Sequence, residues 1–332
     1  MAGLLSPLSF AGLTLRNRIV MPPMWSGQAT PDGGVTDAIV EYHRCRAAAG
    51  CGLVIVEHSF VHPRGRASAT QLGVHTDAMI PGLSRLAAAI KAEGAVACLQ
   101  ISHAGPRTST EVAGARPLGP SATRHVHNAG GELPEAATLP QIADVVAAFG
   151  KAAVRARAAG FDAVELHAAH GFLLSQFLSP LANARDDAYG GSDENRQRLH
   201  LEVLAEVRTC LGQDFPVFVR LGATDETPGG LDIAGGCATA AEMVRGGVDL
   251  VDVSGGLQGS RGTGTGSGYF VPYAEAIKKC VRVPVIVTGG ISDALMADGL
   301  VREGRADLVG IGRAMLNDPD WARKAIASLL PR

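Results

Sequence analysis

The sequence has no block of basic residues and almost no net charge. Thirty lysines and arginines stand against 32 acidic residues, which leaves a formal net charge of −2 in 332 residues. Binding to nucleic acid depends largely on positive charge that neutralises phosphates. No such stripe occurs here, so we expect no nucleic-acid partner.

Long apolar runs are absent as well. The N-terminal residues carry neither the basic segment nor the apolar core of a signal peptide, and no later stretch reaches the length that spans a bilayer. We therefore expect a cytoplasmic protein with no membrane partner.

The cysteines lack the close spacing of a metal site. None stands in a Cys-x-x-Cys pattern, which disfavours structural zinc and iron–sulfur clusters. We expect reduced thiols that are buried as small apolar groups. The six are Cys45, Cys51, Cys98, Cys210, Cys237 and Cys280.

What the chain does contain is a series of short apolar runs, each followed by a stretch typical of a helix. The runs are rich in β-branched residues and do not alternate strictly, as expected for parallel strands covered on both faces. The eight predicted strands are 18–24, 53–58, 95–101, 162–167, 217–221, 250–254, 283–288 and 308–311.

A repeated motif indicates how these units stack. Residues 159–166, 246–253 and 304–311 each place a glycine at a helix end, then a short turn, then an Asp before a strand. Eight βα units predict an α/β fold, a (β/α)8 TIM barrel that forms one domain over residues 1–332. A doubly wound open sheet is the alternative, but the glycine-rich G-x-G-x-x-G loop that would open it is missing.

Two segments fall outside the repeating units. Residues 4–10 and 13–16 flank Ala11-Gly12 and predict a hairpin that plugs the amino end of the barrel. Between Ser102 and Pro140 the chain is rich in Gly, Pro, His and Ala and too irregular for a helix. We expect a long functional loop after the third strand.

Glycines follow the last two predicted strands. Gly289-Gly290 and Gly312-Arg313 offer bare backbone N–H groups and a guanidinium beside helix starts, which predicts a phosphate site. Sugar-phosphate isomerases and aldolases share such a site, so it does not identify the ligand. The five lysines all fall in predicted helices away from strand ends, which disfavours Schiff-base chemistry.

His167 and His170 follow the fourth predicted strand. A metal could bind two histidines, but no carboxylate accompanies them at metal-ligand spacing, so we expect no metal. Two neutral imidazoles are better suited to donating hydrogen bonds to a carbonyl oxygen. Negative charge grows on that oxygen when a hydride reaches the β-carbon.

Distinctive motifs occur at residues 17–24, 100–105, 165–173, 177–183, 189–192 and 194–196, and at Arg185. Together they resemble the motifs of the old yellow enzymes, most closely those of the compact, thermophilic-like bacterial ene-reductases that use FMN. The resemblance covers nearly the whole chain and is most specific between Glu165 and Arg196.

The resemblance implies that FMN binds non-covalently across the barrel mouth. NADPH or NADH would reduce it, and an activated C=C bond of a small carbonyl-type substrate would then take the hydride in the same pocket. The implied catalytic residues are His167 and His170, which would hold the substrate oxygen. The implied substrate pocket adds Gly27, Phe172 and Tyr269. The implied cofactor residues are Pro22, Pro23, Met24, Trp25, His58, Gln100, Arg220, Gly289, Gly290, Gly312 and Arg313.

Four positions depart from the family pattern. Phe172 replaces the usual tyrosine that protonates the α-carbon, and Gly27 replaces a tyrosine that contacts substrate. Trp25 stands where relatives often have a flavin-tuning cysteine, and His58 replaces a small residue. Because a phenyl ring cannot donate a proton, a desaturase, oxidase or double-bond isomerase is the alternative to a reductase. A flavin-binding sensor without turnover is a third hypothesis.

The printed sequence ends at Pro331-Arg332, soon after the last predicted helix. It carries neither the tail that reaches a neighbouring subunit's site in close relatives nor a cysteine-rich extension. We therefore expect an unshared active site and no iron–sulfur chemistry. A homodimer or a higher homo-oligomer is compatible with the family.

Overall fold

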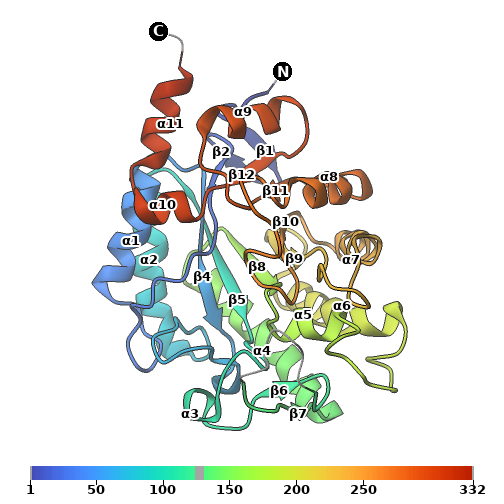
Figure 1. Cartoon of the computed structure of the whole chain (residues 1–332). Coiled ribbons are helices and arrows are strands. Elements are labelled where there is room, and N and C mark those ends of the chain that lie inside the picture. Colours follow the sequence, from blue (N-terminus) through green and yellow to red (C-terminus); the bar gives the residue numbers. More distant parts are fainter. Residues whose placement is uncertain (1, 124–130, 331–332) are drawn as a thin grey trace.

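Eight parallel strands close into a barrel in the computed structural model, which describes residues 2–123 and 131–330 (Figure 1). Their order around the barrel is β10-β11-β12-β3-β4-β5-β8-β9, and every neighbouring pair is parallel. The prediction of a TIM barrel is confirmed. The barrel strands are β3 (Ile19–Met21), β4 (Leu53–Phe60), β5 (Val96–Ser102), β8 (Ala163–Ala168), β9 (Val217–Gly222), β10 (Leu250–Ser254), β11 (Val285–Val287) and β12 (Leu308–Gly310).

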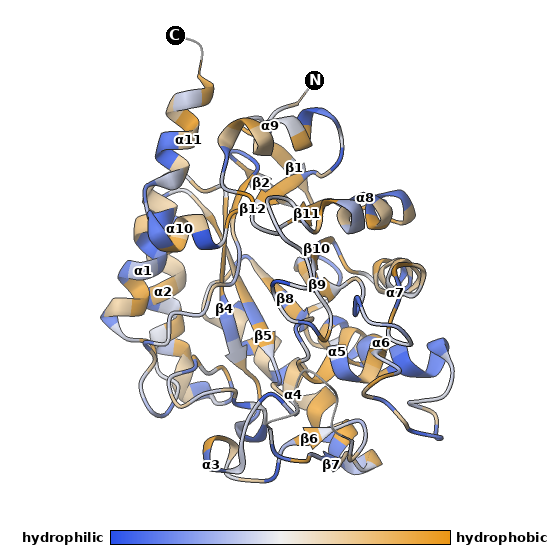
Figure 2. Cartoon of the chain, in the orientation of Figure 1, coloured by the Kyte–Doolittle hydropathy of each residue, from blue (hydrophilic) through white to orange (hydrophobic). Residues whose placement is uncertain are grey.

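Helices follow each barrel strand. Several begin at a side-chain cap that satisfies free N–H groups of the first turn, such as the capping box of Thr138 and Gln141. In Figure 2 hydrophilic residues gather on α6, while β12 is largely hydrophobic. The helices are α1 (Asp37–Ala48), α2 (Ile80–Ala92), α3 (Thr110–Ala113), α4 (Leu139–Ala158), α5 (Leu173–Leu178), α6 (Asp193–Leu211), α7 (Ile233–Arg245), α8 (Val271–Cys280), α9 (Ala294–Arg302), α10 (Arg313–Asn317) and α11 (Trp321–Leu329), with 3-10 turns at Pro63–Gly65 and Asp77–Met79.

The bounds of some barrel strands differ from the predicted ranges. The first barrel strand ends at Met21 rather than at residue 24, because Pro22 and Pro23 have no N–H to donate to a ladder. β4 extends two residues further than expected, to Phe60, across a register shift between Val56 and Ser59. This shift bends the strand beside the barrel mouth.

The predicted N-terminal hairpin is present. β1 (Leu8–Phe10) pairs antiparallel with β2 (Leu13–Leu15), and the turn between them holds Ala11 and Gly12 at positive φ. Leu15 lies in the apolar cluster inside the barrel, and Phe10 packs against Phe218 with ring centroids 5.9 Å apart. The hairpin therefore covers one end of the barrel interior.

The long segment after β5 contains more regular structure than we expected. It holds the one-turn helix α3 and a two-stranded parallel pair, β6 (Leu118–Gly119) with β7 (Glu135–Ala136). In Figure 1 these elements lie together beyond the end of β5. Residues 124–130 belong to the same predicted loop and lie outside the described residues. The prediction that nothing helical forms here was wrong, since Ser109 caps a helical turn.

The cysteines are all free, but only two of them are buried. Cys51 and Cys98 are buried, as expected for small apolar side chains. The burial prediction is wrong for the other four, because these lie on the outer helices. Cys45, Cys210 and Cys237 are half-buried and Cys280 is exposed. Within 2–123 and 131–330, no helix is long and apolar enough to cross a membrane.

Candidate active site

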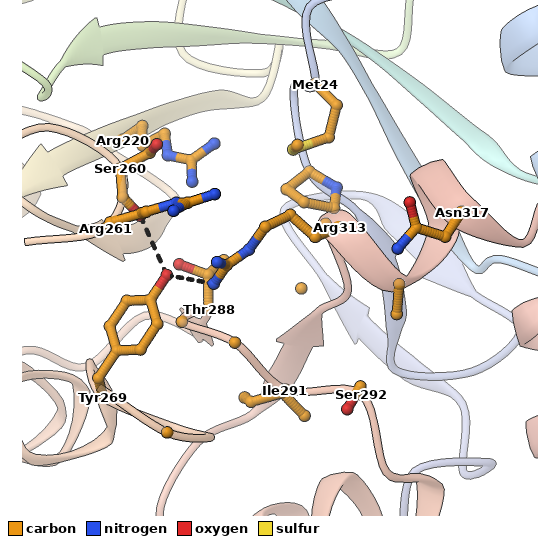
Figure 3. A pocket seen from close by; sticks show the side chains of 17 residues that line it. Met24, Arg220, Ser260, Arg261, Tyr269, Thr288, Ile291, Ser292, Arg313 and Asn317 are labelled. Atoms are coloured by element: carbon orange, nitrogen blue, oxygen red, sulfur yellow. Dashed lines mark hydrogen bonds between the residues drawn. The ribbon is translucent and has the colours of Figure 1, made fainter. Parts of the chain in front are cut away.

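A cavity of about 370 Å³ opens at the carboxyl ends of β3, β9, β11 and β12 (Figure 3). It is lined from one further side by the glycine-rich segment that follows β10. Eight residues that the sequence assigned to the site line this cavity. They are Pro22, Met24, Arg220, Tyr269, Gly289, Gly290, Gly312 and Arg313.

Several of the residues that line the cavity are glycines, whose lack of a side chain leaves space for a ligand. Gly289 and Gly290 have φ of 110° and 74°, which L side chains rarely adopt. A Cβ at Gly312 would lie 3.0 Å from Met24 Sδ. Bare N–H groups can therefore approach a ligand closely, as a phosphate site requires.

Three guanidinium groups converge on this cavity. Figure 3 shows Arg220, Arg261 and Arg313 pointing toward its centre from β9, from the glycine-rich segment and from α10. Arg313 Nη2 donates to the hydroxyl of Tyr269 at 2.8 Å, and that hydroxyl donates to the Ser260 carbonyl at 3.2 Å. Sequence reasoning assigned Tyr269 to the substrate pocket, and in the structure its ring lies against Gly289 and Gly290, which sequence reasoning assigned to the phosphate. The same reasoning missed Arg261, for which no motif gives a signal.

A layer of buried polar side chains lies inside the barrel beside this cavity. Gln100 Nε2 donates to Glu165 Oε1 at 2.7 Å, and Arg220 Nε lies 3.3 Å from Asp252 Oδ2. Burial raises the pKa of Asp252 to about 6 and the pKa of Glu165 well above its usual range. Asp252 Oδ1 and Glu165 Oε2 have no hydrogen-bond partner in the part of the chain that the structure describes. The four side chains come from the adjacent strands β5, β8, β9 and β10, so the barrel fixes the position of the Arg220 charge.

His167 and His170 lie side by side at the end of β8. Their ring centroids are 5.0 Å apart and nearly perpendicular, at 73°. His170 has a φ of 60° and is followed by Gly171 at 72°, so the chain turns sharply and brings the second ring back beside the first. His170 Nε2 lies 2.7 Å from Ser254 Oγ.

Both histidines are neutral. Burial lowers the pKa of each well below its usual value. His170 and His58 lower the pKa of His167 further, and Arg220 lowers that of His170. A neutral imidazole can donate one hydrogen bond without carrying a charge.

Phe172 forms a wall with His167 and His58. Its ring centroid lies 4.5 Å from that of His167 and 5.2 Å from that of His58. The rings of His58 and His167 are nearly parallel, at 14°, with centroids 6.2 Å apart. Sequence reasoning put His58 at the flavin edge, and the structure places it equally in this aromatic wall.

Gln71 sets the orientation of the His58 ring. Its amide nitrogen lies 2.7 Å from His58 Nδ1 and 3.0 Å from the His58 carbonyl, while its amide oxygen accepts from Ala67 N at 2.6 Å. Since the amide nitrogen donates, Nδ1 accepts and the ring proton is on Nε2. No sequence motif pointed to Gln71.

Two of the departures from the family pattern are neighbours in space. A Cβ at Gly27 would lie 3.3 Å from Cζ2 of the Trp25 indole, and Trp25 is 51 % exposed. The indole therefore stands where a side chain at position 27 would begin. Eight predicted site residues do not line the cavity: Pro23, Trp25, Gly27, His58, Gln100, His167, His170 and Phe172.

The sequence model of the NADH:flavin oxidoreductase / NADH oxidase family matches residues 3–330. The chain belongs to this family, the old yellow enzymes. The family prediction is therefore confirmed, and so are FMN as cofactor and NAD(P)H as reductant.

Individual relatives agree with the assignment. The chain is 40 % identical over 327 residues to an "NADPH dehydrogenase" of Bacillus licheniformis, covering 98 % of this chain and 94 % of the relative. It is 39 % identical over 320 residues to an "NADH oxidase" of Thermoanaerobacter brockii. That match covers 94 % of this chain but only 49 % of the relative, so the chain spans about half the length of some curated relatives.

Among solved structures, the old yellow enzyme homologue from Zymomonas mobilis superposes with a TM-score of 0.86 at 27 % identity. The match covers 99 % of this chain and 94 % of that one. The fold is therefore shared along nearly the full length of both proteins.

The residues present at the site fit FMN. Glycine backbone and the guanidinium groups of Arg261 and Arg313 suit a phosphate dianion. Gln100 and Arg220, from β5 and β9, suit the polar edge of a flavin ring. His167 Nδ1 is buried without a hydrogen-bond partner among the described residues, and a ligand in the mouth is the natural source of polar contacts for this wall.

Proposed function

We propose that this enzyme reduces an activated C=C bond, in an α,β-unsaturated carbonyl or nitro compound, with electrons from NAD(P)H. The observation that carries the proposal is the pair of neutral histidines, with rings 5.0 Å apart, beside a cavity that a fixed cation lines. Such a pair polarises a carbonyl and leaves its β-carbon open to a hydride.

His167 and His170 bind and orient the substrate oxygen in this proposal. Because burial keeps both rings neutral, each can donate a hydrogen bond that strengthens as negative charge grows on the oxygen. Ser254 holds the second ring in place through its 2.7 Å contact with His170 Nε2. A neutral imidazole carries one N–H, so His170 can donate to the substrate oxygen from Nδ1 while its Nε2 accepts from the Ser254 hydroxyl.

Arg220 supplies fixed positive charge beside the ring system. Its ion pair with Asp252 and its 3.4 Å contact from Nη2 to Ser254 Oγ hold the guanidinium in one place. The chemistry that FMN supplies when bound is two-electron transfer as a hydride. A preorganised cation at this position would stabilise the negative charge that reduction by NAD(P)H places on the ring system, without reorganising during the reaction.

A second candidate is an oxidase, desaturase or double-bond isomerase of a carbonyl compound. Phe172 favours it, because the ring that contacts both His58 and His167 has no proton to give. Reduction of a C=C bond requires a proton at the α-carbon. The second candidate depends less on an acid at this position.

The test starts from the purified holoenzyme under anaerobic conditions. We expect a yellow protein that releases FMN on denaturation, loses its flavin colour with NADPH or NADH, and regains it when 2-cyclohexenone is added. Bleaching without recovery by the enone would favour the second candidate. A flavin inert to both reagents would indicate a flavin-binding sensor.

A further inference from the structure

Arg107 lies beside the histidine pair and has no role in the proposed reaction. A Cβ at Gly171 would lie 3.6 Å from Arg107 Cδ, so the stem of the arginine runs along the turn that carries His170 and Phe172. The side chain is half-buried, and its charge is close enough to lower the pKa of His170. Arg107 therefore lies next to the wall formed by Phe172, His167 and His58.

Backbone contacts fix this position. Arg107 N donates to the Ala104 carbonyl at 3.1 Å, and the His103 carbonyl accepts from Leu173 N at 2.9 Å. A Cβ at Gly105 would lie only 2.9 Å from Leu173 Cα, so the turn that carries Arg107 packs directly against the start of α5. The backbone of Arg107 is therefore held in place beside the start of α5.

No carboxylate neutralises Arg107 within the described ranges 2–123 and 131–330, where no ion pair or hydrogen bond of its guanidinium occurs. Two acids of the same loop are engaged elsewhere: Glu132 accepts from Thr110 N at 2.8 Å, and Glu135 pairs with Arg64 at 2.6 Å. Residues 124–130 contain no Asp or Glu.

The lone charge is unfavourable in the protein alone. The Arg107 side chain is half-buried, and this burial lowers the pKa of its guanidinium because the charged form loses solvation. A partly desolvated cation without a counter-ion is destabilising until an anion arrives. A guanidinium also presents two parallel N–H groups that match a carboxylate or a phosphate.

We propose that Arg107 binds an anionic group, a carboxylate or phosphate, of the ligand whose carbonyl or nicotinamide end lies at His167 and His170. This inference rests on the proposed function, since it takes that ligand to be the substrate or NAD(P)H. The anion has two sources: an acidic group of the oxidising substrate, or the phosphates of the nucleotide. Both share the chemistry that Arg107 recognises.

The experiment uses holoenzyme and a matched pair of enones, 4-oxopent-2-enoate and its neutral methyl ester. Kd for each is measured on the oxidised enzyme from the change in flavin absorbance, which needs no turnover. Arg107→Met removes the charge, and Arg107→Lys keeps it without the planar fork. Arg282→Met is the control, because Arg282 is an exposed arginine before β11, at the opposite end of the barrel.

For a substrate anion, we expect Arg107→Met to raise Kd for the acid about tenfold or more and Kd for the ester less than about twofold. Arg107→Lys should lie between Arg107→Met and the wild type, and Arg282→Met should match the wild type. In a parallel arm, the concentration dependence of flavin reduction by NADPH and by NADH is measured. If Arg107→Met weakens the binding of NADPH and NADH but not of the acid, the nucleotide phosphates are the anion that Arg107 binds.

Unchanged affinity for the acid and for both nucleotides in Arg107→Met would overturn the inference. Should Arg107→Met lose FMN, Arg107→Gln repeats the measurement with a polar side chain of similar stem. If the reduced wild-type enzyme is reoxidised by neither the acid nor the ester, the proposed function fails. The titration of the oxidised enzyme still decides whether Arg107 binds anions.

Discussion

Replacing Phe172 with tyrosine tests whether the site lacks a proton donor. The phenyl ring is only 7 % exposed and lies 4.5 Å from the His167 ring, beside the place where the substrate oxygen would bind. A positioned general acid contributes about 10²–10⁴-fold to a rate.

We expect Phe172→Tyr to speed reoxidation of the reduced enzyme by 2-cyclohexenone about a hundredfold, the lower end of that range, because the pocket is shaped around a phenyl ring. Stopped-flow absorbance measures this half-reaction separately from reduction by NADPH, which needs no proton from Phe172 and should keep its rate. Phe172→Leu is the control, since it changes the ring without adding an acid.

The reoxidation rate of Phe172→Tyr and its solvent isotope effect together show whether the new hydroxyl supplies the proton. A variant that reoxidises at the wild-type rate, with an unchanged isotope effect, would refute the reasoning. The proton would then already have another source. A slower variant would show that the hydroxyl disturbs binding in the aromatic wall instead of serving catalysis.

Two further predictions concern charge. Arg220→Met should lower the flavin reduction potential by roughly 30–60 mV, the equivalent of one lost hydrogen bond to a charged group, while Arg220→Lys recovers part of it in a spectroscopic titration. Burial raises the pKa of Glu57 from 4.5 to about 7, so the folded state holds its proton more tightly and the wild type loses stability as pH rises through that window. Glu57→Gln should remove this dependence, changing the difference in unfolding free energy between about pH 4 and about pH 8 by on the order of 3 kcal/mol; identical pH profiles in urea titrations would contradict it.

Local pattern was enough to determine the barrel. Apolar runs, helix stretches and the repeated glycine-turn-Asp motif act over a few residues, so eight strands could be predicted before any contact was known. The meeting of Gly289-Gly290 with Gly312-Arg313 could also be predicted from the sequence. Both pairs follow parallel barrel strands, and the carboxyl ends of such strands lie at the same end of the barrel. Strand ends were less predictable, as the early stop at Pro22 shows.

Tertiary packing alone decided which side chains meet. His58 and His167 are far apart in sequence, yet their rings face each other because β4 bends and Gln71 holds one of them. Arg107 has no neighbouring motif, and its isolation from acids appears only when the loop after β5 is folded against Gly171. Sequence patterns report backbone periodicity and local turns. The direction of a side chain and the charge around it depend on distant segments, which only the folded chain brings together.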